Sequence, residues 1–147
     1  MEKHITSSLR TTFLAHMIVA GVFGLAVFII PGRSLTWMGW VPVTYRVPGT
    51  DLTAPGTVFV DPILMRVLGA ALLALAFSSF LGWRAQKWEA VAPAVQFEFA
   101  FCALAFVAFV RGAIMQNGGL AAFPAFGWVC VILLAGFGVM WGLALRK

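Results

Sequence analysis

The sequence predicts an all-α membrane protein, an antiparallel bundle of four transmembrane helices with a small hairpin-containing loop after the first helix. Of the 147 residues, 62% are hydrophobic and 10% are charged, whereas soluble domains carry about 25% charged residues. Four apolar stretches each approach the roughly 20 residues that a helix needs to cross the hydrocarbon core. They occupy residues 9–30, 62–82, 91–111 and 123–145. We therefore expect residues 1–147 to form a single transmembrane domain.

The first apolar stretch is predicted to be a membrane helix and not a secretory signal. Its 22 residues, 9–30, exceed the apolar region of a signal peptide, which normally has about 7 to 15 residues. Pro31 and Gly32 follow directly and are expected to end the helix. Polar residues that can cap its start precede it, namely Thr6, Ser7 and Ser8.

The loop at residues 31–61 is the only sizeable segment outside the predicted membrane helices. Trp37 and Trp40 suit the headgroup level of a bilayer, where tryptophan is enriched. Residues 41–47 and 57–60 are rich in β-branched and aromatic residues and are separated by Pro-Gly turns, which predicts a β-hairpin. Because a two-stranded hairpin is marginally stable alone in water, we expect it to lie on the helix ends and cover one end of the bundle.

The other three spans follow with short connections. Asp61 and Pro62 open the second span, since aspartate is a good N-cap and proline is tolerated at the first helical position. The basic connection at residues 82–90 is short enough to join antiparallel neighbours. Pro93 is expected in the first turn of the third span. Arg146 and Lys147 follow the fourth span as a basic anchor.

The distribution of basic residues predicts the orientation in the membrane. The side that holds both termini and the 82–90 connection carries six basic residues, namely Lys3, Arg10, Arg84, Lys87, Arg146 and Lys147. The opposite side carries four, namely Arg33, Arg46, Arg66 and Arg111. Because cytoplasmic loops carry an excess of Lys and Arg, we expect cytoplasmic termini. The basic residues are scattered singly, so the net charge of +5 does not indicate a nucleic-acid partner.

Small residues one helical turn apart are candidates for helix packing. They let helix backbones approach closely in lipid. Such pairs are Gly138 with Gly142, Ala70 with Ala74, and Ala108 with Gly112. The spacing leaves two alternatives open, packing within the chain and a homo-oligomer interface.

Two ionisable residues inside the spans form the first candidate site. His16 and Glu98 each lie seven positions from the predicted cytoplasmic start of their helix, which places both at a depth of about 10 Å. Ionisable groups inside a membrane are rare and costly. Further polar residues lie between that depth and the cytoplasmic surface, namely Gln96, Ser78 and Ser79. The group is either a ligand or proton site, or a set of polar contacts that hold the helices together.

A second candidate site lies at the opposite membrane face. Asp61, Arg66 and Arg111 come together there if the second and third spans are antiparallel neighbours. Arginine can bind a phosphate bidentately, so a clamp for an anionic headgroup is one interpretation. Pairing of Asp61 with an arginine, which would anchor the extracytoplasmic loop, is the other.

The residue inventory argues against metal, haem and catalytic centres. A bis-histidine haem needs two intramembrane histidines, and the spans offer His16 alone. A zinc or di-iron centre needs several converging His, Cys or carboxylate ligands. Cys102 and Cys130 form no CxxC motif. We see no acid placed beside a Ser and His pair as serine hydrolases require, and we expect no metal and no cofactor.

Several short motifs in the first half of the chain resemble a known group of proteins. They are Pro31-Gly32, Asp61-Pro62, Arg66, the run from Gly69 to Leu73, and Gly82-Trp83-Arg84. In these the chain resembles the small uncharacterised four-helix integral membrane proteins of bacteria, some of them grouped loosely with DoxX-like proteins. The resemblance implies a four-helix bundle in a bacterial inner membrane and no assigned activity.

These observations predict a non-catalytic integral membrane protein. It is expected to be an accessory or assembly subunit of a larger membrane complex, or a binder of a small lipophilic ligand. The expected partners are membrane lipids, and other membrane subunits or further copies of the chain. The alternative from another class is a small proton-coupled transporter or carrier that uses Glu98 and His16. A membrane enzyme acting on lipid or quinone is a third alternative.

Overall fold

The described part of the chain forms four long helices and one short one. The computed structural model describes residues 4–40, 44–46, 49, 53–55, 62–115, 120 and 123–146. The long helices are α1 (Ser7–Ile29), α3 (Pro62–Arg84), α4 (Trp88–Met115) and α5 (Ala125–Leu145), and the short one is α2 (Pro31–Trp37). All four long helices have the length and hydropathy of membrane spans. The prediction of four helices that are long and apolar enough to cross a membrane is confirmed.

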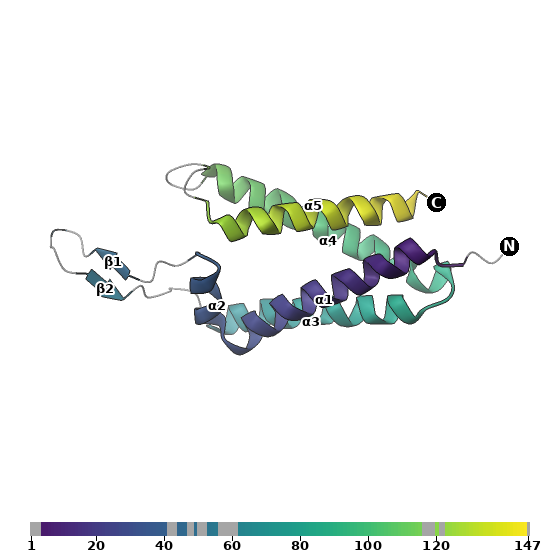
Figure 1. Ribbon diagram of the computed structural model, residues 1–147, viewed down its shortest axis with the longest axis horizontal. Helices are drawn as coiled ribbons and strands as arrows, with labels where there is room; N and C mark the ends of the chain where they lie inside the picture. Colours follow the sequence, from purple (N-terminus) through teal and green to yellow (C-terminus); the bar gives the residue numbers. More distant parts are fainter. Residues whose placement is uncertain are drawn as a thin grey trace.

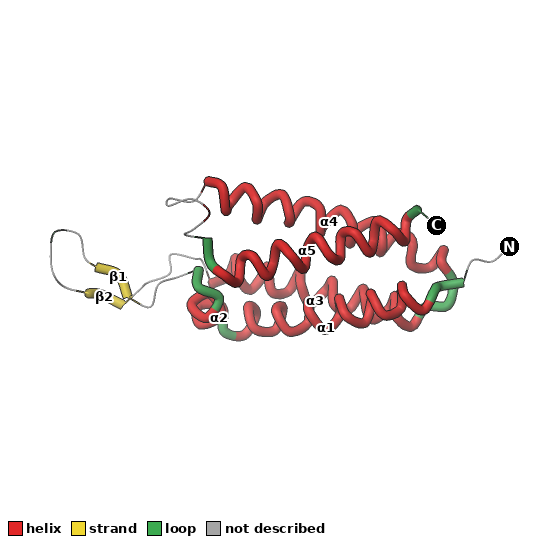
Figure 2. Tube along the Cα trace, turned by 45° about the horizontal axis from the view of Figure 1, so that its top comes forward, coloured by secondary structure: helices red, strands yellow, loops and turns green. Residues whose placement is uncertain are grey.

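The long helices are arranged as two antiparallel pairs and not as an evenly packed bundle (Figures 1 and 2). Helix α1 packs along α3, and α4 packs along α5. Contacts between the two pairs are sparse: α3 meets α4 and α1 meets α5 over short stretches, and α1 and α4 nowhere bring their backbones together. The side chains between the pairs therefore decide how the pairs are held together.

Close approach of α1 and α3 depends on two glycines. A Cβ atom at Gly69 would lie 2.6 Å from the backbone nitrogen of Phe28, and one at Gly24 would lie 3.0 Å from the backbone nitrogen of Leu73. Real Cβ atoms essentially never approach other atoms as closely as 2.6 Å, and a distance of 3.0 Å is tighter than nearly all real Cβ contacts. At these two points the absence of a side chain lets the helix backbones touch, which strengthens dispersion contacts in lipid.

The small-residue pairs that the spacing predicts do not include Gly24 or Gly69. Ala70 and Ala74 are exposed, and a Cβ at Gly112 would meet nothing within 4 Å. Gly138 and Gly142 face Cys102 and Phe99 of α4. This last pair therefore supports the first of the two predicted alternatives, which is packing between helices of the same chain.

The corner after α1 differs from the prediction. Thr6 caps α1 as expected, and its hydroxyl accepts a hydrogen bond of 3.3 Å from the Leu9 amide. Pro31 ends α1 but also begins α2, because proline fits the first helical position, where no intrahelical N–H bond is lost. The Ser34 hydroxyl donates a 2.7 Å hydrogen bond to the Ala26 carbonyl of α1. This bond fixes the angle between the two helices.

Helix α4 begins three residues earlier than predicted, at Trp88. Pro93 consequently lies in the second turn and not in the first. Proline there removes one intrahelical hydrogen bond. Glu89 lies in the first turn, where a negative charge is favourable beside the positive end of the helix dipole.

Two short strands lie between α2 and α3. Strands β1 (Thr44–Arg46) and β2 (Thr53–Pro55) pair antiparallel, with Tyr45 opposite Ala54. The second strand had been expected at residues 57–60, which lie outside the described residues. Within the described segments neither strand contacts a helix. The expectation that a hairpin covers the bundle end is therefore wrong for these two strands.

Among the described residues of this loop, Trp40 contacts the helix ends. Its ring lies edge-on to Phe123 at 5.3 Å and to Phe109 of α4 at 6.0 Å. Such edge-to-face pairs contribute about 0.5–1.5 kcal/mol each beyond area burial. The aromatic stretch after α2, and not a strand, connects the loop to α4 and to the start of α5.

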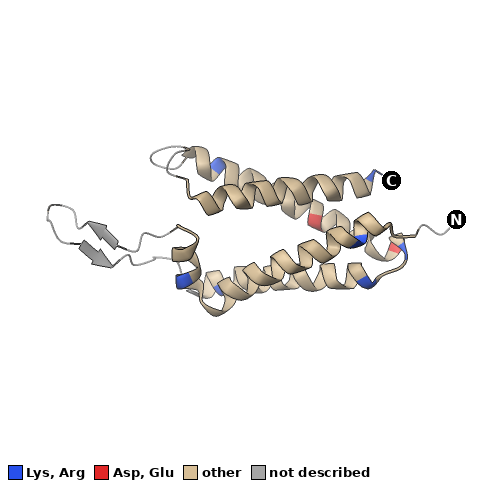
Figure 3. Cartoon of the chain, in the orientation of Figure 1, with Lys and Arg blue, Asp and Glu red and all other residues tan. Residues whose placement is uncertain are grey.

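The two termini lie at the same end of the molecule, as predicted (Figure 1). The amide of Ile5 donates a 3.2 Å hydrogen bond to the carbonyl of Gln86. Arg10 Nη2 donates one of 3.3 Å to the carbonyl of Ala85. These bonds attach the N-terminal segment to the α3–α4 connection. Basic residues are found toward the helix ends (Figure 3).

Candidate functional site

A buried polar cluster lies where the two helix pairs meet. His16 of α1, Ser79 of α3 and Glu98 of α4 converge there, and none of them is more than 6% exposed. Each comes from a different helix. Because the backbones of α1 and α4 do not approach one another, these side chains bridge the space between them. We call these three residues the polar triad.

The polar triad forms a closed set of short contacts. Ser79 Oγ donates a 2.9 Å hydrogen bond to Glu98 Oε1. His16 Nδ1 lies 2.8 Å from Ser79 Oγ and 2.8 Å from Glu98 Oε2. Since the single hydroxyl hydrogen of Ser79 is directed to Glu98, the Ser79 oxygen accepts from His16. The network thus assigns a hydrogen to Nδ1.

The predicted proximity of the histidine and the glutamate is confirmed by this geometry. The two side chains face one another at the same level, as their similar distances from the helix starts indicate. Their bond network also includes Ser79, as the sequence predicted. Whether the group binds a ligand or a proton stays a prediction.

Two buried polar atoms near the polar triad have no aligned hydrogen-bond partner among the described residues. They are Glu98 Oε2 and Trp141 Nε1. Oε2 is within ion-pair distance of His16 Nδ1, but the Nδ1 hydrogen is directed to Ser79. A buried polar atom without a hydrogen bond is costly. Glu98 Oε2 can therefore still accept one hydrogen bond, and Trp141 Nε1 can still donate one.

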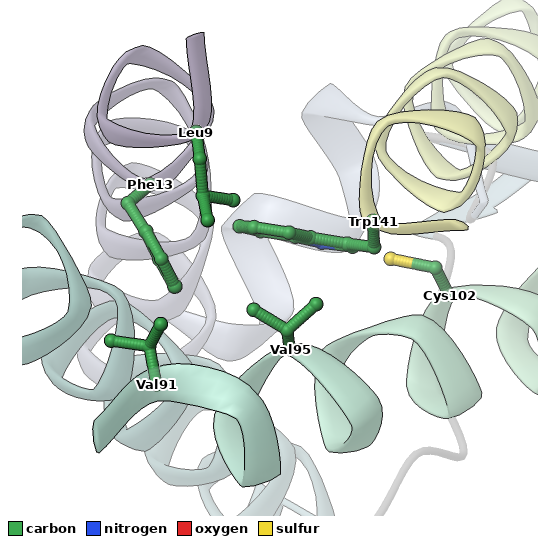
Figure 4. Packing of buried hydrophobic residues seen from close by; sticks show 6 residues of the cluster. All are labelled: Leu9, Phe13, Val91, Val95, Cys102 and Trp141. Carbon is green, nitrogen blue, oxygen red and sulfur yellow. The ribbon is translucent and has the colours of Figure 1, made fainter. Parts of the chain in front are cut away.

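Aromatic side chains of α5 cover the histidine. The rings of Phe137 and Trp141 lie edge-on to His16, with centroid distances of 4.8 and 5.8 Å. Trp141 is fully buried and also packs on Phe13 at 4.9 Å. Figure 4 shows its ring between the α1 side chains and those of α4, with Val95 and Cys102 beside it. The polar triad is thereby enclosed on the α5 side.

The sequence did not reveal this contribution of α5. Its 21 residues are apolar almost throughout, so no polar face marks which side is turned inward. Phe137 and Trp141 are one turn apart, which is a helical spacing shared by many other apolar pairs in the same helix. Only the tertiary packing distinguishes them.

The remaining residues of the first candidate site do not join the cluster. Gln96 is exposed, and Ser78 is half-buried with no recorded bond to the polar triad. The reason is helical geometry, because a residue two positions from Glu98 lies almost on the opposite face of α4. Ser78 is likewise rotated by about 100° from Ser79. The prediction placed Gln96 and Ser78 in the site because of their depth in the membrane, which does not show the helix face on which a residue lies.

The second candidate site does not assemble in the described part of the chain. Arg66 and Arg111 are both exposed. The Arg111 Nε group donates to the sulfur of Met115 at 3.2 Å. The site assumed that α3 and α4 are close neighbours, whereas α3 packs mainly on α1. Asp61 lies outside the described residues.

The polar triad has the residue types of a serine hydrolase site, but its side chains contact one another through different atoms. In a Ser–His–acid triad the histidine uses one ring nitrogen for the serine and the other for the acid. Here Nδ1 meets both Ser79 and Glu98, and the serine hydrogen is directed to the carboxylate. An acid does lie beside the Ser and His pair, but the contacts differ from the arrangement that serine hydrolases require.

Two cavities flank this region. An open groove of about 620 Å³ runs between α4 and α5, and Cys102 lies in it as well as in the buried cluster around Trp141. A smaller pocket of about 170 Å³ lies at the end of the molecule where α1 and α4 begin, and it reaches Thr12. The Thr12 hydroxyl donates to the Ser8 carbonyl at 3.0 Å.

The described residues bring together no three His, Cys, Asp or Glu side chains that could hold a metal ion. Comparison with protein-family models found no match for the chain. Comparisons with curated proteins and with solved structures found none either. The resemblance to DoxX-like proteins stays an expectation, and the function must be argued from the structure of the chain itself.

Proposed function

We propose that the chain is a non-catalytic integral membrane protein that binds a lipophilic ligand in the groove between α4 and α5. The observation that carries this proposal is the groove itself, of about 620 Å³. Except for Arg146, the side chains that line it are apolar, as in Phe106, Leu134 and Val139. Binding sites for small lipophilic molecules are concave, largely apolar and supplied with few polar groups.

The polar triad supports this proposal as a structural clamp. It connects α1, α3 and α4 where the two helix pairs otherwise barely touch. Hydrogen bonds between helices in a membrane contribute about 0.6 kcal/mol on average and up to about 1.7 kcal/mol. Such a clamp keeps α4 in place, and α4 forms one wall of the groove.

Filling the groove is expected to remove the ligand. In a Gly138→Leu variant the new side chain would occupy the groove, because Gly138 lines it. We expect wild-type protein purified in mild detergent to retain extractable lipophilic molecules, and the variant to retain at least fivefold less. The measurement is mass spectrometry of solvent extracts, normalised to protein.

The matched control is Gly136→Leu. Gly136 lies in the same helix, does not line the groove, and has nothing within 4 Å of a built Cβ. This variant should retain as much ligand as the wild type. Equal retention by all three proteins would contradict a ligand site in the groove.

A second candidate function is a proton-coupled carrier, which the small pocket favours. Thr12 lines that pocket and lies one helical turn, about 6 Å, from His16. The pocket therefore reaches within one helical turn of the polar triad. For this function, reconstituted vesicles should show pH-dependent substrate flux that Glu98→Gln abolishes.

An accessory subunit would instead purify with a stoichiometric foreign subunit.

We further propose that both termini are cytoplasmic. The six-to-four distribution of basic residues supports this orientation, and the shared end of the two termini is consistent with it. A green fluorescent protein fused to the C-terminus should fluoresce, and alkaline phosphatase at the same position should be inactive. The same two reporters inserted at Gly49 should give the opposite pattern. Reversed results at both positions would overturn the orientation.

A further inference from the structure

We propose that the groove between α4 and α5 selects an anionic phospholipid, with one acyl chain along the groove and the headgroup phosphate at Arg146. This inference rests on the proposed function and adds to it the chemical class of the ligand. It follows from the length of the groove, its apolar lining and the position of its single charged residue.

The length of the groove corresponds to one leaflet of a bilayer. Along α5 its lining extends from Leu134 to Arg146, which is about 18 Å at 1.5 Å per residue. Half of a hydrocarbon core of about 30 Å is about 15 Å. A chain that begins at the level of Arg146 would therefore reach the middle of the membrane at the far end of the groove.

The lining of the groove suits a hydrocarbon chain. The open groove has a volume of about 620 Å³, and its lining from Leu134 to Leu145 of α5 is apolar. A flexible acyl chain can follow such a lining, whereas a second copy of the chain in the groove would give a dimer.

Arg146 supplies the charge at the end of the groove. It is the C-cap residue of α5 and is exposed. Among the described residues no carboxylate lies within ion-pair distance of Arg146, since the ion pair among them joins His16 and Glu98. A guanidinium matches the geometry of a phosphate and can bind it bidentately. On the proposed cytoplasmic side it would meet the anionic lipids of that leaflet.

The glycines of α5 form the floor on which such a chain would lie. A Cβ at Gly142 would lie 3.3 Å from the Phe99 ring, and one at Gly138 would lie 3.7 Å from the Cys102 Cβ. A Cβ at either position would therefore meet the α4 wall of the groove.

The test compares two lipids that differ in headgroup charge alone. Full-length protein in detergent is mixed with equimolar phosphatidylglycerol and phosphatidylcholine of identical acyl chains, and bound lipid is counted by native mass spectrometry. We expect the wild type to prefer phosphatidylglycerol about fivefold, the factor typical of one basic side chain beside an anionic lipid. Arg146→Gln should abolish the preference while still binding lipid.

The charge-matched control is Arg84→Gln. Arg84 lies in the last turn of α3, on the same proposed membrane side, and stacks over Phe80 outside the groove. This variant should keep the wild-type preference. An equal loss of preference in both variants would overturn Arg146 as the headgroup site, because general surface charge would then explain the selection.

The test separates this inference from the proposed function. Binding of both lipids without preference, lost in Gly138→Leu, would overturn the anionic headgroup and leave the lipophilic site intact. Failure of the wild type to bind either lipid, with no lipophilic molecule in its solvent extract, would overturn both. A lipid-free dimer that Gly138→Leu dissociates would show that a second copy occupies the groove.

Discussion

A Gly69→Val variant is expected to lose most of the packing between α1 and α3. Any Cβ at this position meets the Phe28 backbone at 2.6 to 2.8 Å, and backbone cannot rotate away as a side chain can. Overpacking of a tight contact costs about 1–3 kcal/mol, and here the helices must separate. We expect a clear fall in the thermal unfolding midpoint in detergent, measured by circular dichroism or by tryptophan fluorescence.

Gly112→Val provides the matched control for the same substitution. Gly112 lies in α4, is exposed, and has nothing within 4 Å of a built Cβ. Surface substitutions of this kind usually change stability by less than about 0.5 kcal/mol. A similar midpoint for Gly69→Val and Gly112→Val would mean that α1 and α3 do not touch at Gly69.

A Glu98→Leu variant is expected to loosen the contact between the two helix pairs. It leaves the Ser79 hydroxyl buried without its acceptor and removes the carboxylate that lies beside His16 Nδ1. The loss of an acceptor for a buried donor costs about 1–3 kcal/mol. Because contacts between the pairs are otherwise sparse, we expect them to move apart while each pair stays helical. Cys102, which is 1% exposed, should then react several-fold faster with a membrane-permeant thiol reagent.

Two controls make this result specific. Glu98→Gln keeps a side-chain oxygen that accepts from Ser79, so Cys102 should react little faster than in the wild type. Cys130 of α5 is half-buried in the wild type and lies outside the buried cluster around Trp141, so its reactivity should be the same in all variants. Unchanged labelling of Cys102 in Glu98→Leu would show that the polar triad does not hold the pairs together.

The sequence was sufficient to predict the four spans and their order. Their lengths follow from the thickness of the bilayer, and their ends coincide with Thr6, Pro31, Arg84 and Leu145 within a few residues. The meeting of His16 and Glu98 was also predictable. Two costly polar groups at one depth of a small bundle have few partners except each other.

The pairing of the helices was not predictable in the same way. Apolar spans look alike from every side, so periodicity does not show which face meets which neighbour. The decisive positions are Gly24 and Gly69, and they are ordinary glycines in a chain that has 15 of them. The groove depends equally on tertiary packing, since its floor and its walls come from two helices.

The sparse contact between the α1–α3 and α4–α5 pairs has a consequence for biosynthesis. Each pair consists of spans that are consecutive along the chain, with α2 and the β1–β2 segment inside the first pair. The first pair is complete once Arg84 has left the ribosome, so it can fold in the bilayer while the second is still being translated. Docking of the two helix pairs is then a late step, in which Ser79 and His16 of the first pair contact the Glu98 carboxylate of the second.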